Sequence, residues 1–138
     1  MGAAVLKMRL ADNLTGIWHG LYTYPVARAR VMFDATLIES GSWLSGSTHE
    51  ISSSGPTKGQ IILATILGER AGHRVTFTKT YDGTAPGYTV VEYEAVLSED
   101  CSEIEGRWSI RSNWSGKFLM IRSAGKEQAV GHEAFERI

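Results

Sequence analysis

Aromatic and small residues alternate through residues 16–25, which run Gly-Ile-Trp-His-Gly-Leu-Tyr-Thr-Tyr-Pro. In an extended segment this spacing places Trp18, Tyr22 and Tyr24 on one face, and a proline ends the run. The alternation predicts a β-strand with one aromatic face. Further apolar patterns predict seven more strands, at residues 31–39, 43–51, 60–67, 74–81, 88–98, 103–111 and 117–123.

The segment 60–67 differs from the others because its apolar residues are nearly continuous. Its length and β-branched residues favour a strand over a helix, and a continuous apolar run is typical of a buried strand. Gly68 ends this run. Short turns join most of the predicted strands, and one of them is expected at residues 112–116.

Eight strands at a spacing of about a dozen residues predict an antiparallel meander, either a sandwich or a closed barrel. In a chain of 138 residues we favour the barrel, because closure removes the exposed edge strands. The predicted fold class is therefore all-β, an eight-stranded antiparallel up-and-down barrel. We expect residues 1–138 to form one such domain.

The aromatic faces of the strands together predict the interior of this barrel. The interior residues predicted in this way are Trp18, Tyr22, Tyr24, Phe33, Leu37, Phe77, Tyr81, Tyr93, Trp108, Phe118 and Met120. Glu50, Lys79 and Arg122 fall on the same face, whereas Arg111 falls on the outward face. Charged side chains inside a small barrel are costly unless they are paired or hydrated by a cavity.

Two interpretations of this interior remain open, since an eight-stranded barrel either just fills or holds one small ligand. In the first, tyrosine hydroxyls orient a ligand, Lys79 or Arg122 binds an anionic group, and tryptophans supply apolar walls. The candidate ligand-binding residues are Tyr22, Tyr24, Glu50, Lys79, Tyr81, Tyr93, Trp108 and Arg122. In the second, the core is filled, and Glu50–Lys79 and Arg122–Trp18 are structural pairs.

Composition and charge narrow the classes of partner. The formal net charge is -1, the pI is about 6.4 and no run of lysine or arginine occurs, which argues against nucleic acid and membrane surfaces as partners. No apolar run has the length of a membrane span, and residues 1–8 lack the apolar core of a secretory signal. We therefore expect a cytoplasmic protein.

No residue pattern predicts catalysis, a metal or a cofactor. Cys101 is the only cysteine, and Glu99, Asp100 and Glu103 beside it would raise its pKa. The histidines lack metal-ligand spacing, and no nucleophile elbow or phosphate-binding loop occurs. Trp43 lies next to a turn, as does Trp114, so each could lie at the barrel mouth, at a contact between copies of the chain or against a loop.

The segment Gly16-Ile17-Trp18 resembles the Gly-x-Trp mark of the calycins, a group that comprises lipocalins, fatty-acid-binding proteins and avidins. In that group the tryptophan packs at the closed end of the barrel and an arginine from near the end of the chain covers it. The resemblance thus gives Gly16 and Trp18 a structural role in barrel closure. Arg122 and Arg137 are the candidates for the covering arginine, and we favour Arg122 because it follows the last clear strand.

A looser resemblance to avidins rests on three short stretches. Leu44-Ser45-Gly46-Ser47 resembles their third strand, residues 118–123 resemble a late Trp-Leu-Leu-Arg-Ser run, and residues 131–135 are similar to the streptavidin C-terminus. The biotin contacts do not carry over: Gly20 and Tyr24 stand where avidins place Asn and Ser, and Thr48 replaces a tyrosine. The resemblance therefore implies the barrel without biotin binding.

The first strand also resembles that of nitrobindin, a haem-binding barrel, through Gly16, Trp18, Gly20, Tyr24 and Pro25. That family supplies a histidine near its C-terminus to the iron, and His132 matches this position. The glycine and glutamate repeat that follows in the family is absent here.

The leading hypothesis is a barrel that binds a small molecule, partly apolar and with an anionic or hydrogen-bonding end. One alternative is a haem-binding barrel that uses His132. Another is a filled barrel that acts as a protein interaction module. Nothing in the sequence favours an enzyme.

Overall fold

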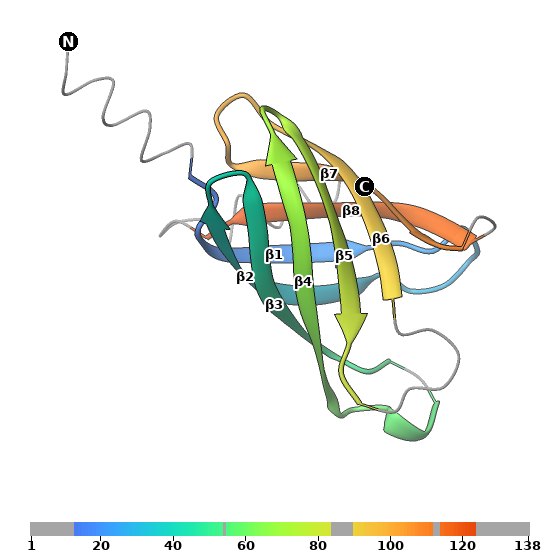
Figure 1. The fold of residues 1–138 in the computed structure, drawn as a ribbon. Coiled ribbons are helices and arrows are strands. Elements are labelled where there is room, and N and C mark those ends of the chain that lie inside the picture. The colour runs from blue at the N-terminus through green and yellow to red at the C-terminus, as the bar shows by residue number, and fades with distance from the viewer. Residues whose placement is uncertain (1–12, 54, 84–89, 112–113, 124–138) are drawn as a thin grey trace, which may run out of the picture.

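The computed structural model describes residues 13–53, 55–83, 90–111 and 114–123. Each strand pairs with its neighbours in the sequence, and the first pairs with the last, so the sheet is closed (Figure 1). The predicted fold class, an all-β eight-stranded antiparallel barrel, is confirmed. The strands are β1 (Gly16–Tyr22), β2 (Val31–Ser40), β3 (Trp43–Ile51), β4 (Ile61–Ala71), β5 (Arg74–Tyr81), β6 (Val90–Leu97), β7 (Glu103–Ile110) and β8 (Trp114–Arg122), and a 3₁₀ turn, η1 (Gly55–Thr57), lies between β3 and β4.

Closure depends on β1, which pairs with β2 on one side and with β8 on the other. The closing register runs from Trp18 opposite Arg122 to Tyr22 opposite Phe118. Both edges of the meander are thereby hydrogen-bonded, which leaves no strand open to pairing with another chain.

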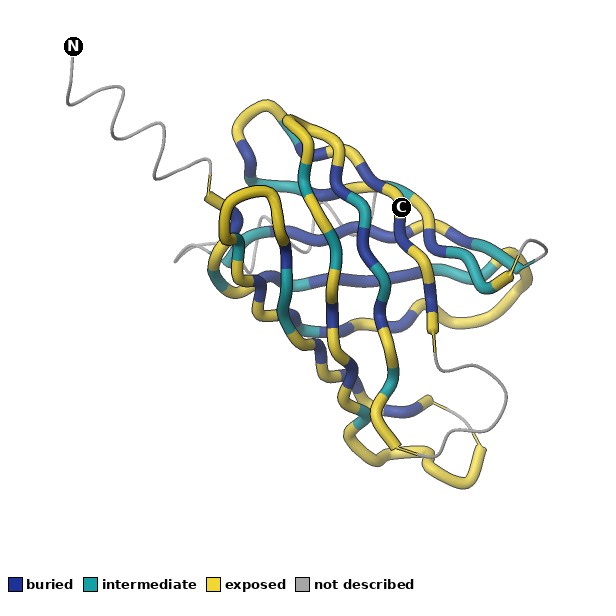
Figure 2. Tube along the Cα trace, in the orientation of Figure 1, coloured by how far each residue is buried: buried dark blue, intermediate teal, exposed yellow. Residues whose placement is uncertain are grey.

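Burial alternates along the strands, because successive side chains point into the barrel and out of it (Figure 2). In β6 the alternation is complete: Tyr93 and Ala95 are buried, whereas Glu92 and Glu94 are exposed. The predicted interior faces of the strands therefore coincide with the core. Its largest side chains include Trp18, Leu37, Phe118 and Met120.

The prediction of a buried strand at residues 60–67 is wrong. In β4 the exposed fractions of Ile61, Leu63 and Leu67 are 65%, 53% and 60%, whereas Ala64 and Ile66 are buried. Each strand of a closed barrel turns only one face to the interior. A continuous apolar run therefore leaves half of its side chains outside.

Three predicted strand boundaries also differ from the structure. β1 ends at Tyr22 and not at residue 25, and β8 begins at Trp114, inside the turn expected at residues 112–116. β4 continues through Gly68 to Ala71. A Cβ atom at Gly68 would lie 2.1 Å from the Thr76 carbonyl oxygen, so this glycine lets β4 and β5 approach closely and does not end the strand.

The antiparallel order gives the barrel two different ends. The connections 23–30 and 52–60 lie at one end, which we call the open end. Residues 13–15 and the turns 41–42, 72–73 and 98–102 lie at the other, which we call the closed end (Figure 1).

Candidate functional site: a cavity at the open end of the barrel

A cavity of about 410 Å³ lies at the open end, where β1, β5 and β7 finish and β6 and β8 begin. Its volume is in the range of small-molecule sites, which is about 300–1,000 Å³. Its lining is aromatic and aliphatic, with two arginines. The lining residues are Tyr22, Tyr24, Arg28, Tyr81, Val91, Tyr93, Trp108, Ile110, Arg111 and Trp114.

Mutual aromatic contacts hold the wall of the cavity in place. The ring centroid of Tyr24 lies 5.8 Å from that of Trp108 and 6.3 Å from that of Trp114, and the two tryptophans are 6.3 Å apart. The indole nitrogen of Trp108 donates a hydrogen bond of 2.8 Å to the carbonyl oxygen of Thr23. Edge-to-face packing of this kind keeps the rings rigid and leaves their remaining surface to a ligand.

Behind the cavity, the carboxylate of Glu50 accepts three hydrogen bonds. Tyr22 donates its hydroxyl at 2.7 Å, Tyr81 at 3.0 Å, and Lys79 its ammonium at 3.3 Å. Glu50 is 6% exposed and Lys79 is 1% exposed. A buried carboxylate requires such compensation, because an unpaired charge in this position costs several kcal/mol.

Aromatic rings surround the ammonium of Lys79. It lies 4.8 Å from the ring centroids of Phe33 and Tyr81, 5.0 Å from that of Tyr22 and 5.7 Å from that of Tyr93. The negative faces of these rings attract a cation. Lys79 is therefore satisfied within the barrel by one carboxylate and by π-faces.

Three tyrosines of the cavity, Tyr22, Tyr81 and Tyr93, keep their protons at neutral pH. Burial is the main cause that raises the pKa of Tyr22, Tyr81 and Tyr93 well above that of an exposed tyrosine, and the charge of Glu50 raises each of them further. Tyr22 and Tyr81 direct their protons to Glu50. Among the described residues the Tyr93 hydroxyl has no hydrogen-bond partner, although its side chain is 3% exposed and lines the cavity.

Two arginines give the mouth of the cavity its charge. The guanidinium of Arg28 lies 4.7 Å from the ring centroid of Tyr24, and Arg111 lines the same cavity from the end of β7. No acidic residue is part of the described lining. The described part of the chain also contains no ion pair of Arg28 or Arg111 with a carboxylate.

Deeper in the barrel the aromatic side chains pack closely. The rings of Phe77 and Tyr93 are stacked at 4.6 Å, and the edge of each faces Phe118, at 6.0 and 4.8 Å. Aromatic side chains therefore fill this part of the interior, whereas a cavity lies at the open end.

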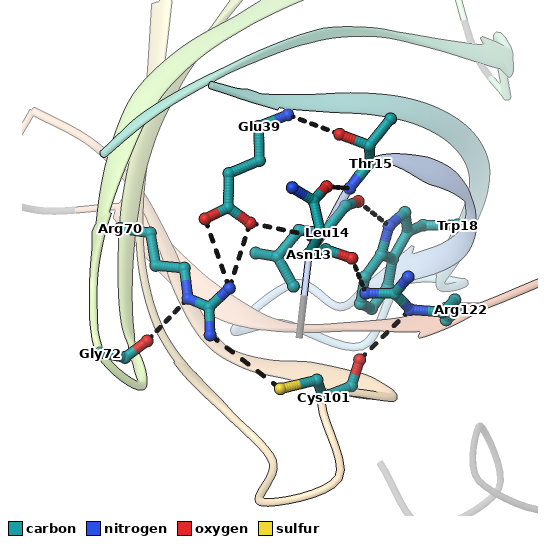
Figure 3. Close-up of polar contacts among 9 residues, drawn as sticks. All are labelled: Asn13, Leu14, Thr15, Trp18, Glu39, Arg70, Gly72, Cys101 and Arg122. Carbon is teal, nitrogen blue, oxygen red and sulfur yellow. Dashed lines mark hydrogen bonds and ion pairs between the residues drawn. The ribbon is translucent and has the colours of Figure 1, made fainter. Parts of the chain in front are cut away.

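Arg122 lies at the closed end, away from the cavity (Figure 3). Its guanidinium lies 4.8 Å from the ring centroid of Trp18 and donates to the carbonyl oxygens of Asn13 at 2.7 Å and of Cys101 at 3.3 Å. The Trp18 indole nitrogen donates to the Leu14 carbonyl oxygen at 3.0 Å. Burial lowers the pKa of Arg122 from its usual value. The contacts are those of an arginine that covers the tryptophan.

A second polar group supports the same end (Figure 3). The carboxylate of Glu39 lies 3.1 Å from the Arg70 guanidinium and accepts the Leu14 backbone N–H at 2.8 Å. Arg70 also donates to the carbonyl oxygen of Gly72 at 2.8 Å and lies 4.0 Å from the sulfur of Cys101. These contacts tie residues 13–15, β2, β4 and the β6–β7 turn together.

The structure divides the predicted ligand-binding residues into three groups. Five of them line the cavity: Tyr22, Tyr24, Tyr81, Tyr93 and Trp108. Glu50 and Lys79 lie behind the tyrosines, and Arg122 lies at the closed end. His132 and Arg137 are outside the described residues, and no cluster of three potential metal ligands occurs among the described ones.

Sequence reasoning missed two of the charged or aromatic lining residues and left a third undecided. Arg28 lies in an irregular connection, for which periodicity defines no face. Arg111 was expected on the outward face and is exposed, but it follows the end of β7 with a left-handed backbone (φ 56°) and also lines the cavity. Trp114 stood next to a predicted turn, so its place at the mouth was one of three open interpretations.

The strands form a closed antiparallel meander, and Arg122 covers Trp18 at its closed end. No protein-family model and no curated protein matches the sequence. Among solved structures, the chain is similar to apocrustacyanin C2, with a TM-score of 0.49 and 12% sequence identity over 97% of this chain and 76% of that chain. Among the described residues, no helix has the length and apolar character to cross a membrane.

Proposed function

We propose that this protein binds a small, largely apolar molecule in the cavity at the open end of the barrel. The observation that supports this most directly is the cavity of about 410 Å³, walled by aromatic rings and closed below by a satisfied polar floor. A space of this size, with a few polar groups among apolar walls, is typical of ligand sites.

The chemistry of the lining favours binding over catalysis. The described lining consists of tyrosine, tryptophan, arginine, valine and isoleucine. None of these forms a nucleophile–base pair there, and the protons of Tyr22 and Tyr81 are committed to Glu50. The lining therefore provides shape, apolar contact and hydrogen bonds.

Calorimetric titration with indole, 2-naphthol and 4-hydroxycinnamate tests the proposal. For a probe of about a dozen heavy atoms we expect saturable binding of at least one compound, with a dissociation constant on the order of 10–100 µM. Trp114→Ala should weaken that binding about tenfold, because it removes part of the aromatic wall.

Trp43 provides the matched control. It is 63% exposed, begins β3 at the closed end and is not part of the cavity lining, so Trp43→Ala removes the same side chain outside the site. The Trp43 variant should bind as the unmodified protein does. No binding of any probe, or equal losses in both variants, would contradict the proposed function.

A further inference from the structure

The geometry points to a ligand class for this cavity: an aryl carboxylate with a hydroxyl group at the end opposite its carboxylate. We propose that the carboxylate lies at Arg28 and Arg111 and that the hydroxyl lies at the tyrosine floor. This inference rests on the proposed function and adds the charge and the orientation of the ligand.

The mouth of the cavity suits an anion. The guanidinium of Arg28 lies over the ring of Tyr24, 4.7 Å from its centroid, and the planar edge of its N–H groups has no carboxylate partner among the described residues. This edge can bind a carboxylate through two parallel hydrogen bonds. Arg111 adds a second positive charge to the same lining.

The charges around the cavity do not cancel. Within the described residues, Arg28 and Arg111 are the charged groups of the lining and carry the same sign. Glu50, behind the tyrosines, is already paired with Lys79 at 3.3 Å, and the exposed Glu92 and Glu94 line a second hollow that also includes Arg111. The lining of the cavity itself therefore carries positive charge, and an anionic group on the ligand would compensate it.

Lys79 is a poor alternative for the carboxylate. Its ammonium is 1% exposed, is bound to Glu50 and is ringed by four aromatic side chains. A carboxylate that reached it would have to displace these contacts and would bring a second negative charge next to Glu50. The anion therefore belongs at the mouth.

The floor of the cavity suits a neutral hydrogen-bonding group. Because Tyr22 and Tyr81 donate their protons to Glu50, their oxygens offer a ligand only lone pairs. The hydroxyl of Tyr93, which lines the cavity and is unpartnered among the described residues, can donate or accept. A phenolic hydroxyl both donates and accepts, so it matches this set, whereas a second carboxylate does not.

Between the two polar ends, the walls suit a flat ring. Tyr24, Trp108 and Trp114 present aromatic faces and edges to the space between mouth and floor. An aromatic ring that packs against such surfaces gains more binding free energy than the burial of its area alone provides. The order from mouth to floor is thus cationic, aromatic and hydrogen-bonding.

A set of calorimetric titrations with related probes tests which ligand charge the cavity prefers. The probes are 4-hydroxycinnamate, its neutral amide and the cation tyramine. We expect the acid to bind about tenfold more tightly than the amide, and tyramine to bind least tightly, because the acid alone can pair with a guanidinium. Cinnamate without the hydroxyl should bind about fivefold less tightly than 4-hydroxycinnamate.

Substitutions of Arg28 and Arg111 test whether these two residues cause the preference for the acid over the amide. Arg28→Gln and Arg111→Gln should each weaken binding of the acid about fivefold or more and leave binding of the amide nearly unchanged. Arg28→Lys keeps the charge without the planar edge and should recover part of the loss. Arg74→Gln, which removes an exposed arginine at the closed end, is the matched control and should bind as the unmodified protein does.

The outcomes separate this inference from the proposed function. Equal affinity for acid and amide, or equal losses of both in the arginine variants, would overturn the ligand class while cavity binding stood. A failure of indole, 2-naphthol and all of these probes to bind would overturn both. Selective loss of the acid in the Arg28 and Arg111 variants would support the inference.

Discussion

Glu50 is the residue on which the polar interior depends. Three donors converge on its carboxylate: the hydroxyls of Tyr22 and Tyr81 and the ammonium of Lys79. Replacement of one partner leaves the other buried charge uncompensated, which costs more than the pair contributes in the intact protein.

Removal of the Lys79 charge should therefore destabilise the barrel strongly. Lys79→Met should lower the free energy of unfolding by about 3–5 kcal/mol, since it leaves Glu50 buried without its cation. Denaturation in urea measures the loss. The double variant Glu50→Gln/Lys79→Met should recover most of it, and a single-variant loss below about 1 kcal/mol would show that Glu50 needs no counter-charge.

The buried tyrosines predict an alkaline limit to stability. Because burial raises the pKa of Tyr22, Tyr81 and Tyr93 in the folded state, the folded barrel favours the protonated phenols. Their contribution to stability is complete below the pKa of an unfolded tyrosine, about 10, and falls as the pH rises above it.

An alkaline titration followed by tyrosinate absorbance and by circular dichroism checks this limit. The absorbance change from the three buried tyrosines should appear together with the loss of the β-sheet signal. Tyr93→Phe should reduce the amplitude of that coupled step. Full ionisation of the tyrosines in a barrel that stays folded would contradict the prediction.

The side-chain period of a strand is enough to predict which of these residues face inward. Glu50 and Lys79 share the parity of their aromatic neighbours, and both are buried. The predicted Glu50–Lys79 pair is present at 3.3 Å, whereas the tyrosine donors to Glu50 were not predicted, because the register between distant strands and the depth of each residue depend on closure. The positions of Arg28 and Arg111 at the cavity could not be predicted from strand periodicity either. Arg28 lies in a loop and Arg111 has a left-handed backbone, so neither follows the period of a strand.

Among the elements, the seam between β1 and β8 explains how the closed end is sealed. Trp18 pairs with Arg122 across this seam, and the guanidinium both covers the indole and holds the carbonyl groups of Asn13 and Cys101. One side chain thus joins the lead into β1, the last strand and the β6–β7 turn. This arrangement assigns Arg122 to structure.

A substitution at this seam should separate stability from binding. Arg122→Ala should lower the free energy of unfolding by about 2 kcal/mol, because it removes the cation–π contact and two hydrogen bonds to carbonyl oxygens. The affinity for 4-hydroxycinnamate should change by less than about twofold, since the cavity lies at the other end. Chemical denaturation and calorimetry on the same protein measure the two effects.

The neighbouring Arg74→Ala variant controls for the loss of an exposed arginine at that end and should change stability by no more than about 0.5 kcal/mol. If Arg122→Ala kept full stability and lost ligand affinity, Arg122 would have the binding role and not the structural one.

The strand elements were predictable because alternation, turn residues and spacing agree with one another. The exceptions have physical causes. Gly68 resembles a strand end in the sequence, yet it allows the close approach of β4 to β5. The polar residues before Lys117 resemble a turn, yet Trp114–Gly116 already pair with β7.

In the whole molecule, the two ends of the barrel differ in their contacts and in their packing. Charged and polar contacts at the closed end tie the chain together around Trp18, and close aromatic packing fills the middle. The cavity of about 410 Å³ lies at the open end, where the strands finish and irregular connections begin. A rigid wall with variable connections at its rim is a common arrangement for a binding site.

The four tryptophans allow one measurement to test this division directly. Trp108 and Trp114 line the cavity, whereas Trp18 lies under Arg122 at the closed end and Trp43 is exposed at the same end. In a two-dimensional ¹⁵N–¹H NMR titration with 4-hydroxycinnamate, the indole N–H signals of Trp108 and Trp114 should shift to saturation. Those of Trp18 and Trp43 should stay in place. Unmoved signals for Trp108 and Trp114, or equal shifts of all the indoles, would contradict ligand binding at the open end.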